Sequence, residues 1–426
     1  DLSGETSMGF IGIVVLLLLA VALSSNRKAI RLRTVGAAFA VQAGLGAFAL
    51  YVPWGQSTLT GISDSVGSLQ GYANQGIDFI FGGLSSGRMF EMFGNGGFVF
   101  AIRVLPLIVF FSSFIAVLYY LGVMSLVIRV IGGGLQRLLG TSRTEAMSAT
   151  ANIFVGQTEA PMVIRPFVRR LTRSELFAVM AGGMASVAGS VLIGYAALGV
   201  ELKYLIAASF MAAPGGLLMA KLMEPETEQP HDTPDELPDD HASKPANVID
   251  AAALGASAGL HLALNVGAML LTFIALIALL NGILGWTGDW FGMPQLNLQL
   301  ILGYLLAPLA FVLGVPWHEA MTAGGLIGEK LVLNEFVAYV DFARYLDPLQ
   351  AAAQGVTVLS AQTQVIVTFA LCGFANLASI GIQLGGLGVM APERRADIAR
   401  LGLKAVVAGT LSNLMSAALA GVFLAL

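Results

Sequence analysis

An internal repeat within strongly apolar sequence is the feature that most constrains how this chain folds. The pentapeptide Glu-Ala-Met-Ser-Ala at residues 145–149 returns as Glu-Ala-Met-Thr-Ala at residues 319–323. Each copy then runs through apolar residues to a second carboxylate, Glu159 in the first copy and Glu335 in the second. Any fold of this chain therefore has to place two related halves that carry acidic residues in apolar surroundings.

A second repeated element follows in the same order. The heptapeptide Gly-Met-Ala-Ser-Val-Ala-Gly at residues 183–189 returns as Gly-Phe-Ala-Asn-Leu-Ala-Ser at residues 373–379. The alternative is chance similarity among Gly/Ala-rich membrane helices, but two matched pairs in one order are harder to obtain by accident than one. Repeats with interrupted apolar segments and polar residues at matching places are typical of secondary transporters, whose site lies between the repeats.

The composition indicates that this chain folds in a lipid bilayer. With 56% hydrophobic and 11% charged residues among 426, it is not an ordinary soluble protein. Its apolar runs of about twenty residues are long enough to cross a bilayer as helices, and no period-two alternation supports a membrane barrel. We therefore predict an all-α polytopic membrane protein. The single Cys372 excludes an internal disulfide and a Cys-rich metal site.

Two interrupted apolar segments have the composition of re-entrant hairpins. Residues 144–168 are broken at residues 156–161 (Gly-Gln-Thr-Glu-Ala-Pro), where Pro161 removes a backbone donor and three polar side chains gather. The second segment runs from Pro316 to Tyr339. Such breaks are tolerated at membrane depth only where they are buried in protein or line a cavity.

The distribution of Lys and Arg predicts that the two hairpins face opposite sides of the membrane. Residues 26–33 are basic and therefore cytoplasmic, which places the N-terminus outside. Four arginines at residues 165–173 place the first hairpin on the cytoplasmic side, whereas residues 340–364, after the second hairpin, contain one Arg and no Lys. The two repeats are thus predicted to be inverted.

We divide the chain into five parts on these grounds. Residues 8–140 hold N-terminal helices and interfacial segments on the scaffold side, and residues 55–97 are expected to form short helices. Residues 141–223 form the first repeat, and residues 298–426 form the second, each with a hairpin and two spans. Residues 248–297 form a long scaffold or trimerisation helix and a loop.

The remaining part, residues 224–247, is predicted to be a solvated cytoplasmic linker with no binding role. Its five prolines lie among acidic residues, a composition typical of unfolded segments. His231 and His241 belong to it and are not metal-ligand candidates.

Glu159 and Glu335 are candidate binding residues because a charge at membrane depth costs about 2.5–3.5 kcal/mol and usually marks a pathway. They could accept hydrogen bonds from hydroxyl or amide-like groups of a polar substrate. The alternative is that each caps a helix at a hairpin tip, where backbone amides need partners. Glu145 and Glu319, at the hairpin starts, are interpreted as caps or interfacial groups.

Neutral oxygen donors also recur within the repeats, at Asn152, Ser186, Asn376 and Ser379. Together with backbone carbonyls freed at a helix break, such oxygens suit Na⁺ better than Mg²⁺, which prefers carboxylates and water. The alternative is that they hydrogen-bond neighbouring helices.

Three motifs resemble the signatures of the concentrative nucleoside transporters. They are Gly-Gln-Thr-Glu-Ala-Pro at residues 156–161, Asn-Glu-Phe-Val-Ala-Tyr at residues 334–339 and Cys-Gly-Phe-Ala-Asn at residues 372–376. The resemblance is to the bacterial branch and covers essentially the whole chain from Met8. It implies about eight transmembrane helices, two opposed re-entrant hairpins, and a homotrimer scaffolded by the long helix near residues 248–286.

The resemblance also implies a role for each candidate residue. The residues implied for the nucleobase are Gln157, Thr158, Glu159, Val191, Leu262 and Phe374. The residues implied for the ribose hydroxyls are Glu335, Asn376 and Ser379. A sodium ion is implied on the side chains of Asn152 and Ser186 and on the carbonyls of Val155 and Val187.

The sequence as a whole predicts a sodium-coupled symporter that carries a nucleoside such as uridine into the cell across a bacterial inner membrane. Na⁺ is the co-transported ion, and no enzyme activity, organic cofactor or nucleic-acid partner is expected. Two alternatives are proton coupling through Glu335 or Glu159, and an intramembrane enzyme using these glutamates as acid and base. The inverted repeats and the lack of a Ser/His, Asp/Asp or metal constellation oppose the enzyme.

Overall fold

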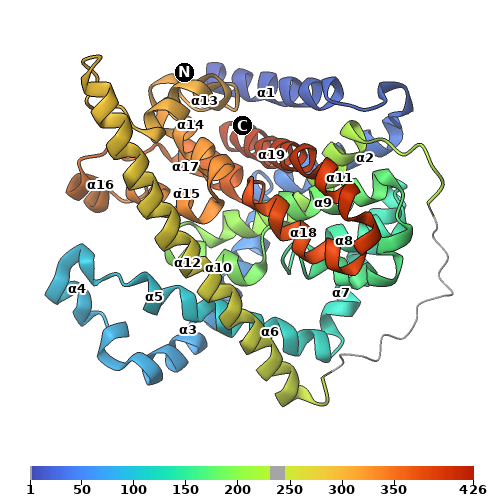
Figure 1. Cartoon of the computed structure of the whole chain (residues 1–426), viewed down its shortest axis with the longest axis horizontal. Helices are drawn as coiled ribbons and strands as arrows, with labels where there is room; N and C mark the ends of the chain where they lie inside the picture. Colours follow the sequence, from blue (N-terminus) through green and yellow to red (C-terminus); the bar gives the residue numbers. More distant parts are fainter. Residues whose placement is uncertain (1, 231–244) are drawn as a thin grey trace.

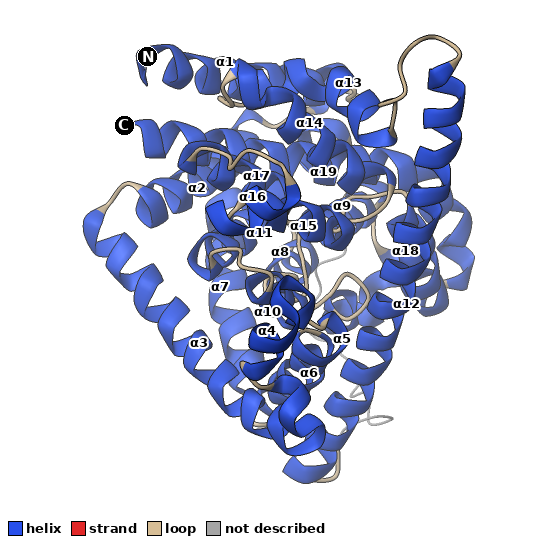
Figure 2. Ribbon diagram, turned by 90° about the vertical axis from the view of Figure 1, so that its left-hand side faces the viewer, coloured by secondary structure: helices blue, strands red, loops and turns tan. Residues whose placement is uncertain are grey.

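A computed structural model describes residues 2–230 and 245–426, and every regular element in these residues is helical (Figure 2). Six helices are long and apolar enough to cross a membrane, or seven if the bent pair α13 and α14 counts as one span. The prediction of an all-α membrane protein is therefore confirmed. His231 and His241 lie outside the described residues.

The N-terminal part precedes the repeats and packs beside them. Its helices are α1 (Leu2–Ala22), α2 (Leu32–Leu50), α3 (Pro53–Phe81), α4 (Arg88–Phe93) and α5 (Phe100–Arg103). The prediction of short helices from residue 55 is wrong for its first half, because α3 is one 29-residue helix. It buries Leu59, Ala73 and Ile77, and these apolar contacts outweigh the helix-weakening effect of its glycines.

The remaining helices form two arrays with the same order of elements, except that the short helix α16 (Pro348–Gln354) of the second array has no counterpart in the first. The first comprises α6 (Leu105–Tyr120), α7 (Val123–Leu139), α8 (Arg143–Ala151), η4 (Ala160–Arg170), α9 (Arg173–Ala185), α10 (Gly189–Ala197) and α11 (Leu202–Met223). The second comprises α12 (Val248–Asp289), α13 (Leu298–Val312), α14 (Trp317–Val332), α15 (Glu335–Phe342), α16 (Pro348–Gln354), α17 (Ala361–Leu371), α18 (Ala378–Met390) and α19 (Arg395–Ala425). The repeat read from the sequence thus extends to the succession of helices.

A broken helix lies at the centre of each array. The first of the two spans predicted after the first hairpin is two helices, α9 and α10, separated by residues 186–188, of which Ser186 and Ala188 have extended backbone. The corresponding break in the second array separates α17 from α18 at residues 372–377. No proline marks the first break, so apolar periodicity alone did not reveal it.

Burial separates a packed centre from an exposed frame. In the spans formed by α9 with α10, by α11 and by α19, 94%, 94% and 89% of the most apolar window is buried. The corresponding share is 17% for α12 and 22% for the α5–α6 span. The helix α12 runs diagonally across the molecule in Figure 1, and with α3 it follows the outer edges in Figure 2.

Small residues allow α12 to pack closely on α6. A Cβ atom added at Gly255 would lie 2.5 Å from the Cβ of Ala116, and one added at Gly259 would lie 2.7 Å from the Cβ of Ser112. Close approach through glycine is a common way for membrane helices to associate. The contact holds the long helix on the first array.

We predict that Gly259→Leu lowers thermal stability in detergent, because the larger side chain forces α12 away from Val109 and Ser112. Overpacking of this kind costs about 1–3 kcal/mol. Gly282→Leu is the matched control, since nothing lies within 4 Å of a Cβ added at Gly282 on the same helix. Equal melting temperatures for the two variants in a fluorescence-detected unfolding assay would contradict the prediction.

Candidate functional site

The helix breaks of the two arrays lie against each other. The backbone N–H of Phe374 donates to the carbonyl of Ser186 at 3.0 Å. The side-chain amide of Asn413, on α19, donates to the carbonyls of Ala185 at 2.7 Å and Cys372 at 2.9 Å. Polar groups of residues 152–159 and 374–379, far apart in the sequence, thereby meet in one region.

The tip of the first hairpin reaches α18 across this region. Gln157 is buried, and its Nε2 donates to the hydroxyl of Ser379 at 3.1 Å. The Oε1 atom of Gln157 is buried with no hydrogen-bond partner among the described residues. Thr158 is half-buried against α18, where a Cβ at Gly386 would lie 2.9 Å from its Cγ2. Glu159 is exposed.

The second hairpin presents a buried carboxylate to the same region. Glu335 begins α15, where the helix dipole favours a negative charge. Its Oε1 accepts a hydrogen bond from the Tyr195 hydroxyl at 3.1 Å, and its Oε2 accepts one from Asn376 Nδ2 at 3.2 Å. Asn334, and not Glu335, caps the helix by accepting from the Val337 amide at 2.9 Å. Glu335 is therefore not explained as a cap.

Asn152 is a buried amide with unmet hydrogen-bonding capacity. It is 1% exposed at the end of α8, and neither its Nδ2 nor its Oδ1 has a partner among the described residues. Its Nδ2 would lie 3.6 Å from a Cβ at Gly182, so the amide abuts α9 just before the break. Buried polar side chains nearly always have partners, so this amide indicates a ligand.

Further oxygens that are unpaired or weakly bonded come from the first hairpin and from the α9 break. The carbonyls of Val155 and Val187 accept no hydrogen bond from the described residues. The hydroxyl of Ser186, 1% exposed, makes a single long contact of 3.4 Å to the Gly183 carbonyl. This donor chemistry, neutral side-chain and backbone oxygens, fits an alkali cation. Within the described residues, no group of three or more His, Cys, Asp or Glu could hold a metal.

The other predicted residues differ in their burial. Val191, on α10, is 1% exposed and belongs to the central core, whereas Phe374 and Leu262 are half-buried at its margin. Leu262 comes from α12, so the frame helix also contributes to this margin.

Three further buried residues of this region were not predicted from the sequence as site residues: Tyr195, Lys330 and Asn413. Tyr195 stacks on Tyr339 with ring centroids 4.3 Å apart while it donates to Glu335. Lys330 Nζ donates to the carbonyl of Ala370 at 2.8 Å. The sequence did contain a signal for two of them, because Lys330 is a cation within the apolar second hairpin and Asn413 is an amide within the last span.

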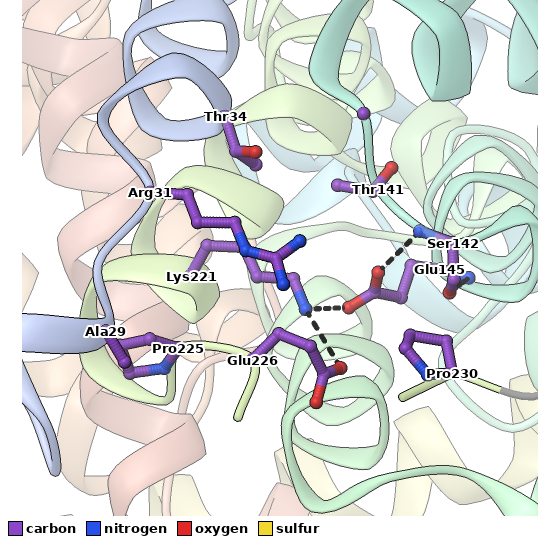
Figure 3. A pocket seen from close by; sticks show the side chains of 11 residues that line it. Ala29, Arg31, Thr34, Thr141, Ser142, Glu145, Lys221, Pro225, Glu226 and Pro230 are labelled. Carbon is purple, nitrogen blue, oxygen red and sulfur yellow. Dashed lines mark hydrogen bonds and ion pairs between the residues drawn. The ribbon is translucent and has the colours of Figure 1, made fainter. Parts of the chain in front are cut away.

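Glu145 has a structural role at the other end of the first hairpin (Figure 3). With Ser142 it forms a capping box at the start of α8, and it also forms an ion pair with Lys221. Glu319 likewise caps a helix, accepting from the Ser360 N–H and hydroxyl at 2.8 Å each at the start of α17. The interpretation as a cap at the hairpin start is confirmed for Glu145, whereas Glu319 bonds the start of a different helix, α17, and does not cap α14.

The start of the predicted linker is not solvated. Glu226, 9% exposed, accepts from Thr172 at 2.8 Å and lies with Lys221 beside a small cavity that Arg31 also lines (Figure 3). Glu224 is 2% exposed and pairs with Arg173 at 2.8 Å. Although burial alone would raise the pKa of Glu224, hydrogen bonds from Ser25 and Arg173 lower it. The prediction of a wholly solvated linker is therefore wrong for its first residues.

Comparison with known families covers most of the chain. Residues 11–84 match the family described as Na⁺ dependent nucleoside transporter N-terminus, and residues 204–421 match its C-terminus. Residues 101–201 match a family described as nucleoside recognition.

Individual relatives match over nearly their full length. An uncharacterized transporter of Haemophilus influenzae is 58% identical, over 98% of this chain and 97% of its own. The nucleoside permease NupC of Helicobacter pylori is 53% identical, over 98% of this chain and 97% of its own. The solved structure of CNTnw in an inward-facing substrate-bound state is 60% identical, with a TM-score of 0.94 over 98% of each chain.

We predict that Lys221→Met destabilises the protein, because it leaves the buried carboxylates of Glu145 and Glu226 without their cation. Removing one partner of a buried pair costs about 3–5 kcal/mol. The control is Lys203→Met, since Lys203 pairs with Glu201 through side chains that are 37% and 60% exposed. Such surface pairs contribute about 0–1 kcal/mol. Similar losses of melting temperature in both variants would contradict the prediction.

Proposed function

This chain belongs to the family of Na⁺-dependent nucleoside transporters, and we propose that it is a symporter that uses the Na⁺ gradient to carry nucleosides into the cell. It is a membrane transporter and not an enzyme. The observation that carries the proposal is the buried Asn152 amide, which has no hydrogen-bond partner among the described residues and lies at the junction of the first hairpin and the α9 break.

The proposed sodium site joins the first hairpin to the broken helix. The ion would bind the Oδ1 of Asn152 and the carbonyl of Val155 from the hairpin, and the hydroxyl of Ser186 and the carbonyl of Val187 from the break. Supporting this assignment, both carbonyls accept no hydrogen bond from the part of the chain that the structure describes, and Asn152 and Ser186 are buried. Bound sodium would fix the hairpin tip and so raise affinity for a ligand that contacts this tip, which is the coupling.

The proposed nucleoside site lies between the hairpin tip and the second array. Its base-recognition groups are Gln157, Thr158 and Glu159, with Val191, Leu262 and Phe374 as apolar walls. Its ribose-binding groups are Glu335, Asn376 and Ser379. Gln157 bonds to Ser379 and Asn376 bonds to Glu335, so these groups can exchange mutual hydrogen bonds for bonds to hydroxyls and a base edge.

The exposed apolar face of α12 bears on the oligomeric state and the membrane environment of the transporter. The helix α12 exposes Leu264, Leu271 and Leu279 by 60–74%, which suits a face in contact with lipid or with other copies of the chain. We propose a homotrimer built on α12 in a bacterial inner membrane, with the N-terminus outside. The hairpins would move against this frame as the site opens to alternate sides.

Sodium coupling is tested in proteoliposomes by imposing a Na⁺ gradient and a pH gradient separately. We expect labelled uridine uptake to follow an imposed Na⁺ gradient and to be absent with a pH gradient in choline buffer. Asn152→Leu should weaken uridine binding at saturating Na⁺ by about tenfold or more, because a buried site loses one ligand and gains apolar bulk. Uptake driven equally well by the pH gradient would favour the proton-coupled alternative through Glu335 or Glu159.

The division of the site predicts different selectivity effects from its two sides. Gln157→Ala should change the ratio of pyrimidine to purine nucleoside affinities, because an amide can both donate to and accept from a base edge. Asn376→Ala should weaken the binding of all nucleosides to a similar degree, because Asn376 is proposed to contact the ribose that they share. The measurement is inhibition of uridine uptake by a nucleoside panel. The same proportional losses in both variants would refute the assignment.

A further inference from the structure

Lys330 is a deeply buried cation whose ligands resemble those of a metal ion. It lies in the last turn of α14, is 1% exposed, and donates from Nζ to the Ala370 carbonyl at 2.8 Å and to Asn413 Oδ1 at 2.6 Å. Among the described residues it forms no ion pair with a carboxylate. A buried ammonium held by neutral carbonyl oxygens uses the donor chemistry that also suits Na⁺.

Lys330 joins two elements of the second array that correspond to the two elements joined by the proposed sodium ion in the first. The sodium ligands come from the end of α8, the first helix of its hairpin, and from the break that ends α9. Lys330 comes from the last turn of α14, the first helix of the second hairpin, and reaches the last turn of α17, which ends at Leu371. In each array a cation would join the same two elements.

Asn413 connects these two junctions. Its Oδ1 accepts from Lys330, and its Nδ2 donates to Ala185 in the first break and to Cys372 in the second. The Asn413 side chain packs closely against the second break, since a Cβ at Gly373 would lie 2.1 Å from Asn413 Oδ1. The ammonium group is therefore built into the contact between the breaks.

We propose that the Lys330 ammonium is a tethered cation that occupies the second array's counterpart of the sodium site. The second hairpin is then held on α17 at all times, whereas the first is held on α9 only when Na⁺ binds. Exchangeable sodium binds at one junction, and the ion acts on the ligand through the first hairpin alone. This inference rests on the proposed function for the first of the two sites.

The test removes the tether and supplies a free cation in its place. Labelled uridine binding to the purified protein is measured against Na⁺ in choline buffer, with and without methylammonium, for the wild type and Lys330→Ala. We expect the wild type to respond to Na⁺ with a Hill coefficient of about 1 and not to methylammonium. Lys330→Ala should bind uridine about tenfold to a hundredfold more weakly, because buried acceptors lose their donor.

Methylammonium should restore much of the affinity of Lys330→Ala, because the small cation fits the space left by the side-chain end. Lys203→Ala, at an exposed lysine, should show neither the loss nor the recovery. Folded Lys330→Ala with reduced affinity and no response to methylammonium would overturn the proposal, since a merely structural lysine would behave in this way.

A second variant keeps the test decisive if Lys330→Ala does not fold. Lys330→Gln retains a donor of similar length without the charge, and we expect weaker uridine binding from it. Wild-type affinity together with a wild-type sodium curve in Lys330→Gln would overturn the proposal. A wild type whose uridine binding ignores Na⁺ would refute the sodium site instead, and the methylammonium result would still decide the role of Lys330.

Discussion

The structure depends on how backbone groups freed at two helix breaks find partners where water is scarce. At membrane depth an unpaired N–H or C=O costs several kcal/mol, so a broken helix persists only when other parts of the chain supply the missing bonds. Here the Gly189 N–H donates to the Phe154 carbonyl, and the Phe374 N–H donates to the Ser186 carbonyl. The carbonyls of Val155 and Val187 accept no hydrogen bond from the described residues, and the Asn152 amide also has no partner among them. The candidate cation site consists of what this network leaves unpaired.

The backbone groups freed at the two helix breaks have different kinds of partner in the two arrays. In the second, an ammonium and an amide of the chain itself, Lys330 and Asn413, bond the carbonyls at the end of α17. In the first, Asn413 also bonds the Ala185 carbonyl at the end of α9, but the carbonyls of Val155 and Val187 accept no hydrogen bond from the described residues. Two similar arrays thus carry two unequal hairpins: side chains hold the second, and under the proposed sodium site the first would respond to an ion. In that proposal, the inequality would let a bound ion act on one side of the nucleoside site and leave the other unchanged.

Much of this organisation was readable from the sequence because it depends on local composition. The repeated motifs, the Pro161 break and the cap at Glu145 need only neighbouring residues to be recognised. The errors concern long-range contacts. The break after α9 has no proline, α3 persists through its glycines because Leu59, Ala73 and Ile77 pack on other helices, and Glu224 is buried because α9 and α19 provide Arg173 and Lys404.

The sequence by itself determined the membrane class, the order of the elements and the kinds of polar group available in each half. These follow from apolar length, charge distribution and the residues that interrupt helices, all of which act over a few turns. Only the tertiary structure decided which polar groups satisfy one another and which remain open. Gln157 meets Ser379 across 222 residues, and Asn413 meets Ala185 across 228. Such pairings depend on how whole helices pack, and no local pattern encodes them.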